Sequence, residues 1–348
     1  MLYEMYQYYG MERQRACYTI HNFKHQGSCG NEILVATGLN RPEYYFHYDR
    51  LQDNFNPFAL NLMKGGIVYS NFVNTVSPHH AWEARFTDVG YGLGHTLELH
   101  QDKFSGILNG VDYNLWNPET DELIPAQYGI DDMKGKAENK KALREKLLLT
   151  DSDKPIIAFI GRLDEQKGVH LVHHAMYYAL DRNAQFVLLG SATSPDINSR
   201  FWHEKHFLND NSDVHLELSF DEELAHLIYA GADMVVVPSK FEPCGLTQLI
   251  SLKYGTVPIV RGVGGLLSTV FDRDYDLDRA PEKRNGYVFY QTDNHAIESA
   301  MERAIGLYYE YPKEFEQLVQ QGMECDYSWR SAGAQYLNAY EQIVFKYS

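Results

Sequence analysis

The sequence predicts an α/β fold in which parallel sheets are covered by helices, and three observations carry that prediction. Short apolar runs recur along residues 155–290, and most are followed by a segment with apolar residues at helical spacing. The run Val235, Val236 and Val237 has no polar alternation, as expected for a strand buried on both faces of a parallel sheet. Glycines and polar residues follow several of these runs, at the strand ends where open α/β sheets bind ligands.

The composition excludes several classes of protein. The 348 residues allow two domains, and no apolar run approaches roughly eighteen residues, so no membrane-spanning helix is expected. The net charge of −16 disfavours nucleic acid and anionic membranes as partners. The four cysteines form no CxxC pair, which indicates a reducing compartment, and no targeting segment is visible after Met1.

Few strands are predicted in residues 1–150. Helical spacing at residues 2–9 predicts a helix that begins with the chain. Strands are expected at 16–20, 72–77 and 104–109, and within the polar and aromatic residues 31–66, residues 41–57 are expected to form a loop between helices. Three strands are fewer than the six of a complete doubly wound domain, so this first domain is expected to be incomplete.

Two polar residues of this first part follow predicted strands. His21 lies at the carboxyl end of strand 16–20, although single histidines are mostly structural or exposed. Asn109 begins an Asn-Gly turn after the strand at 104–109. His79 and His80 are adjacent, and two adjacent histidines cannot chelate one metal from a single helix face, so we expect no metal site there.

The second part of the chain predicts a complete domain. Strands are expected at 155–163, 185–190, 213–220, 234–239, 256–260 and 286–289. Helices are expected at 169–180, 199–208, 221–232, 245–254, twice within 294–322, and at 331–345. This alternation predicts a parallel sheet of about six strands with helices on both faces, as a doubly wound domain needs.

The loop after strand 234–239 is the strongest candidate for a binding site. It leads Glu242 and Cys244 into a helix predicted to begin near Gly245. Unpaired N–H groups and the positive end of a helix dipole favour a phosphate at such a place. Because a carboxylate on the helix axis would repel phosphate, we expect Glu242 to face sugar hydroxyls. The alternative is an ordinary connection without a ligand.

Two further connections are expected to open toward the same cleft. Arg162 and Lys167 follow strand 155–163, and two cations can stabilise a diphosphate leaving group without a metal. Gly264 and Gly265 follow strand 256–260, where the absence of side chains lets the backbone approach a ligand. The spacing of Arg162 and Lys167 alone is better explained by a solvated loop, and a lone Gly-Gly is weak evidence, but their positions after strands favour a site.

Several of these segments resemble one family of glycosyltransferases. FEPCGLTQ (241–248) resembles the donor-binding signature of bacterial glycogen synthases and plant soluble starch synthases, glycosyltransferase family 5, and CYTIHNFKHQG (17–27) resembles their Thr-x-His-Asn segment. The resemblance covers nearly the whole chain and is greatest for the plant-type and cyanobacterial starch synthase branch.

The resemblance implies a GT-B fold, with two Rossmann-like doubly wound domains that face a cleft. Residues 1–150 would be the C-terminal part of the starch synthase catalytic domain, and 151–325 the glycosyltransferase group 1, nucleotide-binding domain. Residues 326–348 would form the C-terminal helix that crosses back to the first domain. Residues 90–97 would lie beside the acceptor glucan.

The resemblance also implies an activity: transfer of glucose from ADP-glucose to the non-reducing end of an α-1,4-glucan, with retention of configuration and without a metal or cofactor. Arg162 and Lys167 would bind the phosphates, Glu242 the glucose hydroxyls and His21 the region of the glucose 6-hydroxyl. The implied donor-binding residues are Asn109, Phe220, Cys244, Gly245, Leu246, Thr247, Gly264 and Gly265. At Phe220, bacterial synthases usually have Tyr.

The sequence departs from the family pattern at its start. The Lys-x-Gly-Gly-Leu loop and the His-x-His-Asp-Trp segment do not occur, so on the order of a hundred residues of the first domain are expected to be missing. The chain would then be a fragment, or be completed by an N-terminal segment or in an oligomer. The alternatives are a non-catalytic glucan- or nucleotide-binding protein and a GT-B transferase that uses another nucleotide sugar. Family membership implies the bacterial cytoplasm or the plastid stroma.

Overall fold

The computed structural model describes residues 9–37 and 42–346, which belong to two compact units. Unit 1 comprises Met1–Asn109 and Arg330–Ser348, and unit 2 comprises Gly110–Trp329. The helix expected at residues 2–9 falls almost wholly on residues 1–8, outside the described residues. In the described part of the chain, no helix combines the length and the apolar character needed to cross a membrane.

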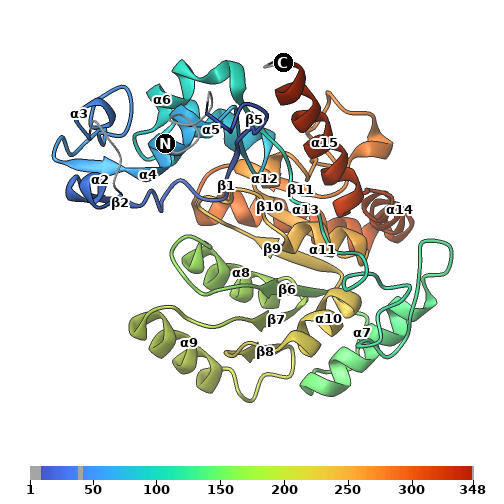
Figure 1. Ribbon diagram of the computed structural model, residues 1–348. Helices are drawn as coiled ribbons and strands as arrows, with labels where there is room; N and C mark the ends of the chain where they lie inside the picture. Colours follow the sequence, from blue (N-terminus) through green and yellow to red (C-terminus); the bar gives the residue numbers. More distant parts are fainter. Residues whose placement is uncertain (1–8, 38–41, 347–348) are drawn as a thin grey trace. The chain divides into compact units, whose positions relative to one another are not determined.

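Unit 2 is built on a parallel six-stranded sheet with the strand order β11-β10-β9-β6-β7-β8 (Figure 1). The strands are β6 (Ile156–Ile160), β7 (Gln185–Leu189), β8 (Val214–Glu217), β9 (Met234–Val237), β10 (Val257–Arg261) and β11 (Tyr287–Phe289). When the strands are numbered within the domain, this is the doubly wound order 3-2-1-4-5-6. All strands are parallel, and the sequential order of the strands changes direction between β6 and β9. The predicted α/β class is therefore confirmed for this part of the chain.

Helices follow the strands in the predicted alternation and lie on both faces of the sheet. They are α7 (Lys134–Leu147), α8 (Val169–Asp181), α9 (Pro195–Phe207), α10 (Glu222–Gly231), α11 (Thr247–Lys253), α12 (Gly264–Leu267), α13 (Asn294–Glu310) and α14 (Pro312–Met323). A short 3-10 turn, η3 (Pro281–Lys283), precedes β11. Gly264 and Gly265, which the sequence placed in the connection after strand 256–260, lie in the short helix α12.

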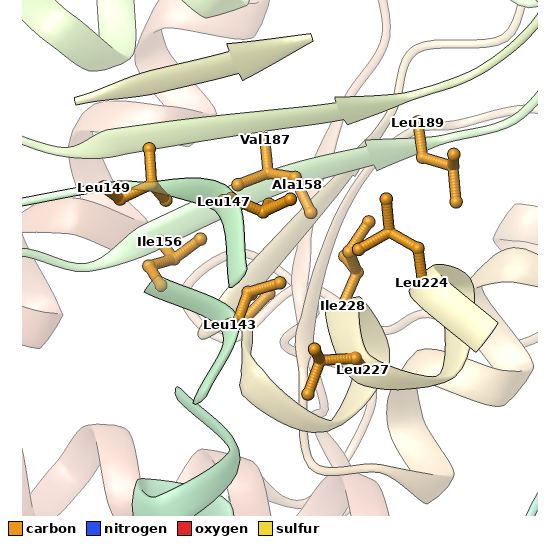
Figure 2. Close-up of a cluster of buried hydrophobic side chains, with 11 residues drawn as sticks. Leu143, Leu147, Leu149, Ile156, Ala158, Val187, Leu189, Leu224, Leu227 and Ile228 are labelled. Carbon is orange, nitrogen blue, oxygen red and sulfur yellow. The ribbon is translucent and has the colours of Figure 1, made fainter. Parts of the chain in front are cut away.

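The core of unit 2 explains where residues 110–150 belong. Figure 2 shows Leu143 and Leu147 of α7 and the following Leu149 packed with side chains of β6, β7 and α10. These three leucines are 0%, 7% and 7% exposed. From the sequence, residues 110–150 are expected in the first domain, whereas in the structure they belong to unit 2, where the apolar face of α7 is buried.

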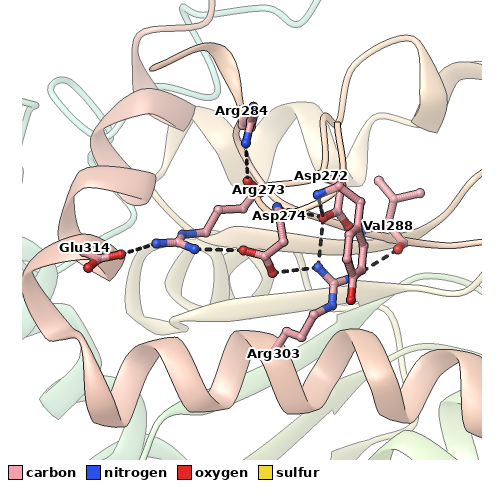
Figure 3. A network of polar contacts seen from close by, with 8 residues as sticks. Asp272, Arg273, Asp274, Arg284, Val288, Arg303 and Glu314 are labelled. Atoms are coloured by element: carbon pink, nitrogen blue, oxygen red, sulfur yellow. Dashed lines mark hydrogen bonds and ion pairs between the residues drawn. The ribbon is translucent and has the colours of Figure 1, made fainter. Parts of the chain in front are cut away.

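A charged network closes the outer edge of this sheet at β11 (Figure 3). Asp272 accepts a hydrogen bond from the backbone N–H of Val288 at 2.6 Å, and Arg303 donates to the Val288 carbonyl at 3.4 Å. Arg303 also contacts Asp272 at 2.8 Å and Asp274 at 2.9 Å. The network takes the place of a further strand, since it satisfies backbone groups that a sheet edge leaves unpaired.

Unit 1 contains a parallel three-stranded sheet in the order β1-β4-β5 and an antiparallel pair, β2-β3. The strands are β1 (Cys17–Ile20), β2 (Ser28–Gly30), β3 (Ala59–Asn61), β4 (Phe72–Thr75) and β5 (Phe104–Gly106). The helices are α2 (Glu32–Ala36), α3 (Pro42–Tyr45), α4 (Leu62–Tyr69), α5 (Pro78–Phe86), α6 (Gly94–Leu99) and α15 (Trp329–Lys346), with 3-10 turns η1 (Asp88–Gly90) and η2 (Gln101–Lys103). The three predicted strands are present, whereas β2 and β3 were not predicted because three residues are too few to show a period.

The C-terminal helix α15 packs in unit 1. The buried Asn74 of β4 donates to the Tyr336 hydroxyl of α15 at 3.1 Å and accepts from Thr19 of β1 at 2.8 Å. One amide in the middle of the sheet thus connects two strands to the helix.

Candidate functional site

Three loops of unit 2 meet at the carboxyl ends of β6, β9 and β10. They are residues 161–168, 238–246 and 262–266, the last of which runs into the short helix α12, and they contain most of the residues predicted for the site. The backbone N–H of Lys240 donates to Gln166 at 2.7 Å, and that of Gly265 donates to Glu242 at 2.9 Å. Because β6 and β9 flank the point where the strand order reverses, this is the place where a doubly wound domain binds its ligand.

The central contact is an ion pair between Lys167 and Glu242. Lys167 Nζ lies 2.5 Å from Glu242 Oε2, and the side chains are 20% and 8% exposed. The Ser239 hydroxyl donates to the same oxygen at 2.9 Å. Within the described residues, nothing donates to Glu242 Oε1, so one oxygen is fixed while the other remains able to accept.

The loop that carries Lys167 is shaped by an acidic residue that the sequence analysis did not single out. Asp164 accepts a hydrogen bond from the Lys167 backbone N–H at 2.9 Å, and it also lies 3.4 Å from Arg162. The Arg162 side chain is 58% exposed. An Asp three residues before Lys167 is a turn signal that could have been read from the sequence.

Two glycines let these loops pack backbone against backbone. A Cβ at Gly265 would lie 2.0 Å from the Cys244 carbonyl oxygen, and one at Gly168 would lie 2.1 Å from the Pro238 carbonyl oxygen. Gly168 also has a φ of +71°, which favours glycine. From the sequence, Gly265 is expected to allow the approach of a ligand, whereas in the structure the Cys244 backbone fills the space beside it.

The helix after the 238–246 loop begins later than predicted. Gly245 has a φ of +74° and is not helical, and α11 begins at Thr247. The Thr247 hydroxyl donates to the Ile160 carbonyl of β6 at 3.4 Å. Cys244 is 5% exposed, whereas Leu246 is 48% exposed.

Phe220 is 84% exposed and follows β8. The parallel sheet places it at the same end as Arg162 and Glu242, although β7 separates β8 from β6. At the rim of the site, Glu165 and Lys240 form an exposed ion pair at 2.6 Å. The hydrogen bond and the charge of Lys240 lower the pKa of Glu165.

His21 and Asn109 lie in unit 1. His21 is exposed directly after β1. Asn109 is half-buried, and its buried Oδ1 has no hydrogen-bond partner within the described residues. Both therefore have polar groups that a ligand could use.

Unit 1 also contains a hollow of about 1240 Å³. Its walls include the exposed rings of Phe55, Phe86 and Tyr91 and the charged Asp53 and Arg85. Planar rings beside hydrogen-bonding groups suit a sugar polymer. The pair His79 and His80 lies on α5, where each ring contacts Glu83, and no group of three potential metal ligands occurs in the described residues.

Comparison with known proteins identifies relatives over nearly the whole chain. Residues 1–99 match the family model of the starch synthase catalytic domain, and residues 139–321 match that of glycosyl transferases group 1. The chain is 70% identical over 347 residues to glycogen synthase 1 of Trichormus variabilis, covering 100% of this chain and 70% of that protein. It is 56% identical to glycogen synthase 2 of Methylococcus capsulatus, covering 98% of this chain and 70% of that protein.

Solved structures agree with these matches. The catalytic domain of starch synthase IV from Arabidopsis thaliana, bound to ADP and acarbose, is 42% identical with a TM-score of 0.93, covering 99% of this chain and 70% of that chain. Anabaena HepE in complex with UDP and glucose is 13% identical with a TM-score of 0.60, covering 95% of this chain and 72% of that chain, and supports the fold alone.

The fold and the site define a glycosyltransferase of the GT-B class. The chain belongs to the glycogen synthase family, glycosyltransferase family 5, as its sequence indicated. It is a hexosyltransferase that transfers glucose in glycogen or starch synthesis.

Proposed function

We propose that the donor is ADP-glucose and that glucose is transferred to the non-reducing end of an α-1,4-glucan with retention of configuration. The observation that carries this proposal is the contact between Lys167 and Glu242 at the reversal of the strand order. It puts a phosphate-binding cation beside a carboxylate that can hold sugar hydroxyls. The ADP bound to the related starch synthase IV supports the choice of nucleotide.

Arg162 and Lys167 are proposed to bind the diphosphate and to stabilise it as it leaves. The Arg162 side chain is 58% exposed and lies 3.4 Å from Asp164, so its planar N–H groups can bind phosphate oxygens. Lys167 is held beside Glu242 as a compact charge. Two cations can offset the developing negative charge, so the proposed route calls for no metal ion or cofactor.

Glu242 is proposed to orient the glucose. Its Oε2 is held by Lys167 and Ser239, which leaves Oε1 to accept hydrogen bonds from the sugar hydroxyls. His21 would contact the region of the 6-hydroxyl, and Asn109 would lie near the donor. Both assignments rest on the family resemblance.

The remaining donor contacts are proposed from the loops. The backbone N–H groups of Cys244, Gly245 and Leu246 would bind sugar or phosphate, and Thr247 would lie on the nucleotide side. Gly264 and Gly265 would border the ligand from the second loop. The exposed ring of Phe220 would stack on the base, without the hydroxyl contact that Tyr offers.

We propose a route without a covalent enzyme intermediate. The leaving group departs with the help of Arg162 and Lys167, and the acceptor hydroxyl attacks from the same face. The buried position of Cys244 agrees with a role in shaping the loop rather than in attack. The hollow of unit 1 is a proposed binding place for the glucan, because its rings lie beside the segment 90–97.

The test is Lys167→Ala, assayed by transfer of labelled glucose from ADP-glucose to glycogen. We expect kcat to fall by about 100- to 1000-fold, as when one stabilising group at a developing negative charge is removed. Lys141→Ala is the matched control, because Lys141 is 69% exposed on α7. Its activity should equal that of the unmodified chain.

The same assay separates the competing functions. Binding of ADP and glucan without any transfer by the unmodified chain would favour a non-catalytic binding protein. A clear preference for UDP-glucose would contradict the proposed donor.

The compartment is a proposal as well. The two relatives named above are bacterial glycogen synthases, and all four cysteines are free thiols. We propose the bacterial cytoplasm, with the plastid stroma as the corresponding place in a plant.

A further inference from the structure

Gln248 of α11 is a buried amide that touches the 238–246 loop directly and is connected to Gly265 of the second loop through Thr269. Its exposed fraction is 0%, and that of its neighbour Thr269 is also 0%. We propose that Gln248, acting through Thr269, is a positioning residue that holds loops 242–246 and 262–266 in the arrangement that binds the donor. The inference rests on the donor role proposed above for these loops.

The contacts of Gln248 determine which end of the amide faces the loop. The two N–H groups of its Nε2 face three acceptors, the carbonyl oxygens of Cys244 at 3.0 Å and Gly245 at 2.9 Å and the Thr269 hydroxyl at 3.2 Å, so one N–H is shared. Backbone carbonyls only accept hydrogen bonds, so the nitrogen end must point at them. Glutamate has the same shape but could not make these contacts.

A chain of hydrogen bonds runs from this amide to the second loop and back. The Thr269 hydroxyl donates to the Gly265 carbonyl at 2.7 Å, and the Gly265 N–H donates to the Glu242 carbonyl at 2.9 Å. This series of hydrogen bonds therefore begins at Cys244, passes through Gln248, Thr269 and Gly265, and returns to Glu242. Moving either loop would therefore break at least one of these hydrogen bonds.

The planar peptide bond transmits this constraint to the ligand side. In a trans peptide, the C=O and the following N–H point in opposite directions. Holding the carbonyls of Cys244 and Gly245 toward Gln248 therefore directs the N–H groups of Gly245 and Leu246 away from it. These are two of the N–H groups proposed to bind sugar or phosphate.

Gly245 leaves the space that the Gln248 amide occupies. Gly245 has a φ of +74°, and a Cβ there would lie 2.4 Å from Gln248 Oε1. That oxygen is buried and accepts no hydrogen bond within the described residues. A buried acceptor without a partner costs stability, so Gln248 is better explained by what its nitrogen positions than by stability alone.

The experiment compares Gln248→Met and Thr269→Val with the unmodified chain. For Gln248→Met we expect kcat/KM for ADP-glucose to fall about 100-fold, the effect of displacing bound groups by roughly 1 Å, with the KM for glucan unchanged. Thr269→Val should cost about tenfold, the equivalent of one hydrogen bond, and Thr269→Ser should retain full activity. Because both residues belong to the same series of hydrogen bonds, the double variant should have a kcat/KM no lower than that of Gln248→Met alone.

A second readout needs no turnover. In Gln248→Met, the rate of amide hydrogen exchange should rise in both loops, 242–246 and 262–266. The control is Gln342→Met, which replaces an exposed amide of α15 and should change the exchange rate in neither loop. If the unmodified chain shows no transfer, the proposed function fails, and the exchange result still decides the positioning role. Activity of Gln248→Met within about threefold of the unmodified chain, or exchange unchanged in the 262–266 loop, would overturn the inference.

Discussion

Gly265 shows how a single missing side chain decides the geometry of the site. The space that its Cβ would fill is occupied by the Cys244 carbonyl oxygen, at 2.0 Å. This carbonyl belongs to backbone and cannot rotate away as a long side chain could. The requirement for glycine is therefore set by the packing of two loops and follows from no local turn rule.

Gly265→Ala is expected to separate the loops and to lower both stability and activity. We expect a loss of about 1–3 kcal/mol in the free energy of unfolding, as for an overpacked core position, and a higher KM for ADP-glucose. Thermal unfolding and initial-rate kinetics measure the two effects.

The matched control is Gly306→Ala in α13, where nothing lies within 4 Å of the added Cβ. Alanine in a helix interior should stabilise the protein by about 0.5–1 kcal/mol without changing the kinetics. A stable and fully active Gly265→Ala protein would contradict the proposed interlocking of the loops.

At the scale of elements, β11 is an edge strand that is completed by side chains. Asp272 and Arg303 satisfy the N–H and C=O of Val288, and the Asp272 and Arg303 side chains are 7% and 18% exposed. The sequence predicted the strand but gave no sign of this network, because its members are far apart along the chain. Asp272 and Arg303 are 31 residues apart.

Asp272→Ala is expected to destabilise unit 2 by about 1–3 kcal/mol, because it leaves the buried N–H of Val288 unpaired and removes one of the two carboxylates that Arg303 contacts. Urea denaturation monitored by circular dichroism measures the change. Glu302→Ala serves for comparison: the Arg182–Glu302 pair is exposed by 47% and 56%, so its loss should cost less than about 1 kcal/mol. Equal effects of the two substitutions would show that the network does not stabilise the edge.

At the scale of the whole molecule, the boundary between the units lies at Asn109 and Gly110 rather than at residue 150. The family model of glycosyl transferases group 1 begins at residue 139, inside α7. The buried leucines of α7 and the segment after it show that unit 2 needs this helix, which covers α10 and the sheet.

Two fragments test this boundary. Residues 110–329 should fold alone, unfold cooperatively and bind ADP. Residues 151–329 lack three buried leucines, each worth about 1.5–3 kcal/mol, and should be unfolded or aggregated. Circular dichroism, thermal unfolding and ADP titration distinguish the fragments, and a stable 151–329 fragment would place the boundary where the sequence analysis did.

Local patterns determined much of this protein. The alternation of apolar runs and helical spacing predicted the six strands of unit 2 and its helices other than α7 and α12, and the segment FEPCGLTQ indicated the family. These features are readable because strand and helix periods, turns and motif residues depend on near neighbours in the chain.

Only the tertiary structure decided the rest. It paired Lys167 with Glu242, 75 residues away, packed α7 in unit 2 and filled the space beside Gly265 with backbone. It also showed that Gln248 and Thr269 connect the two loops. The physical reason is the same in each case: these contacts join residues that are distant in sequence, and no local period or turn signal records which distant surfaces will meet.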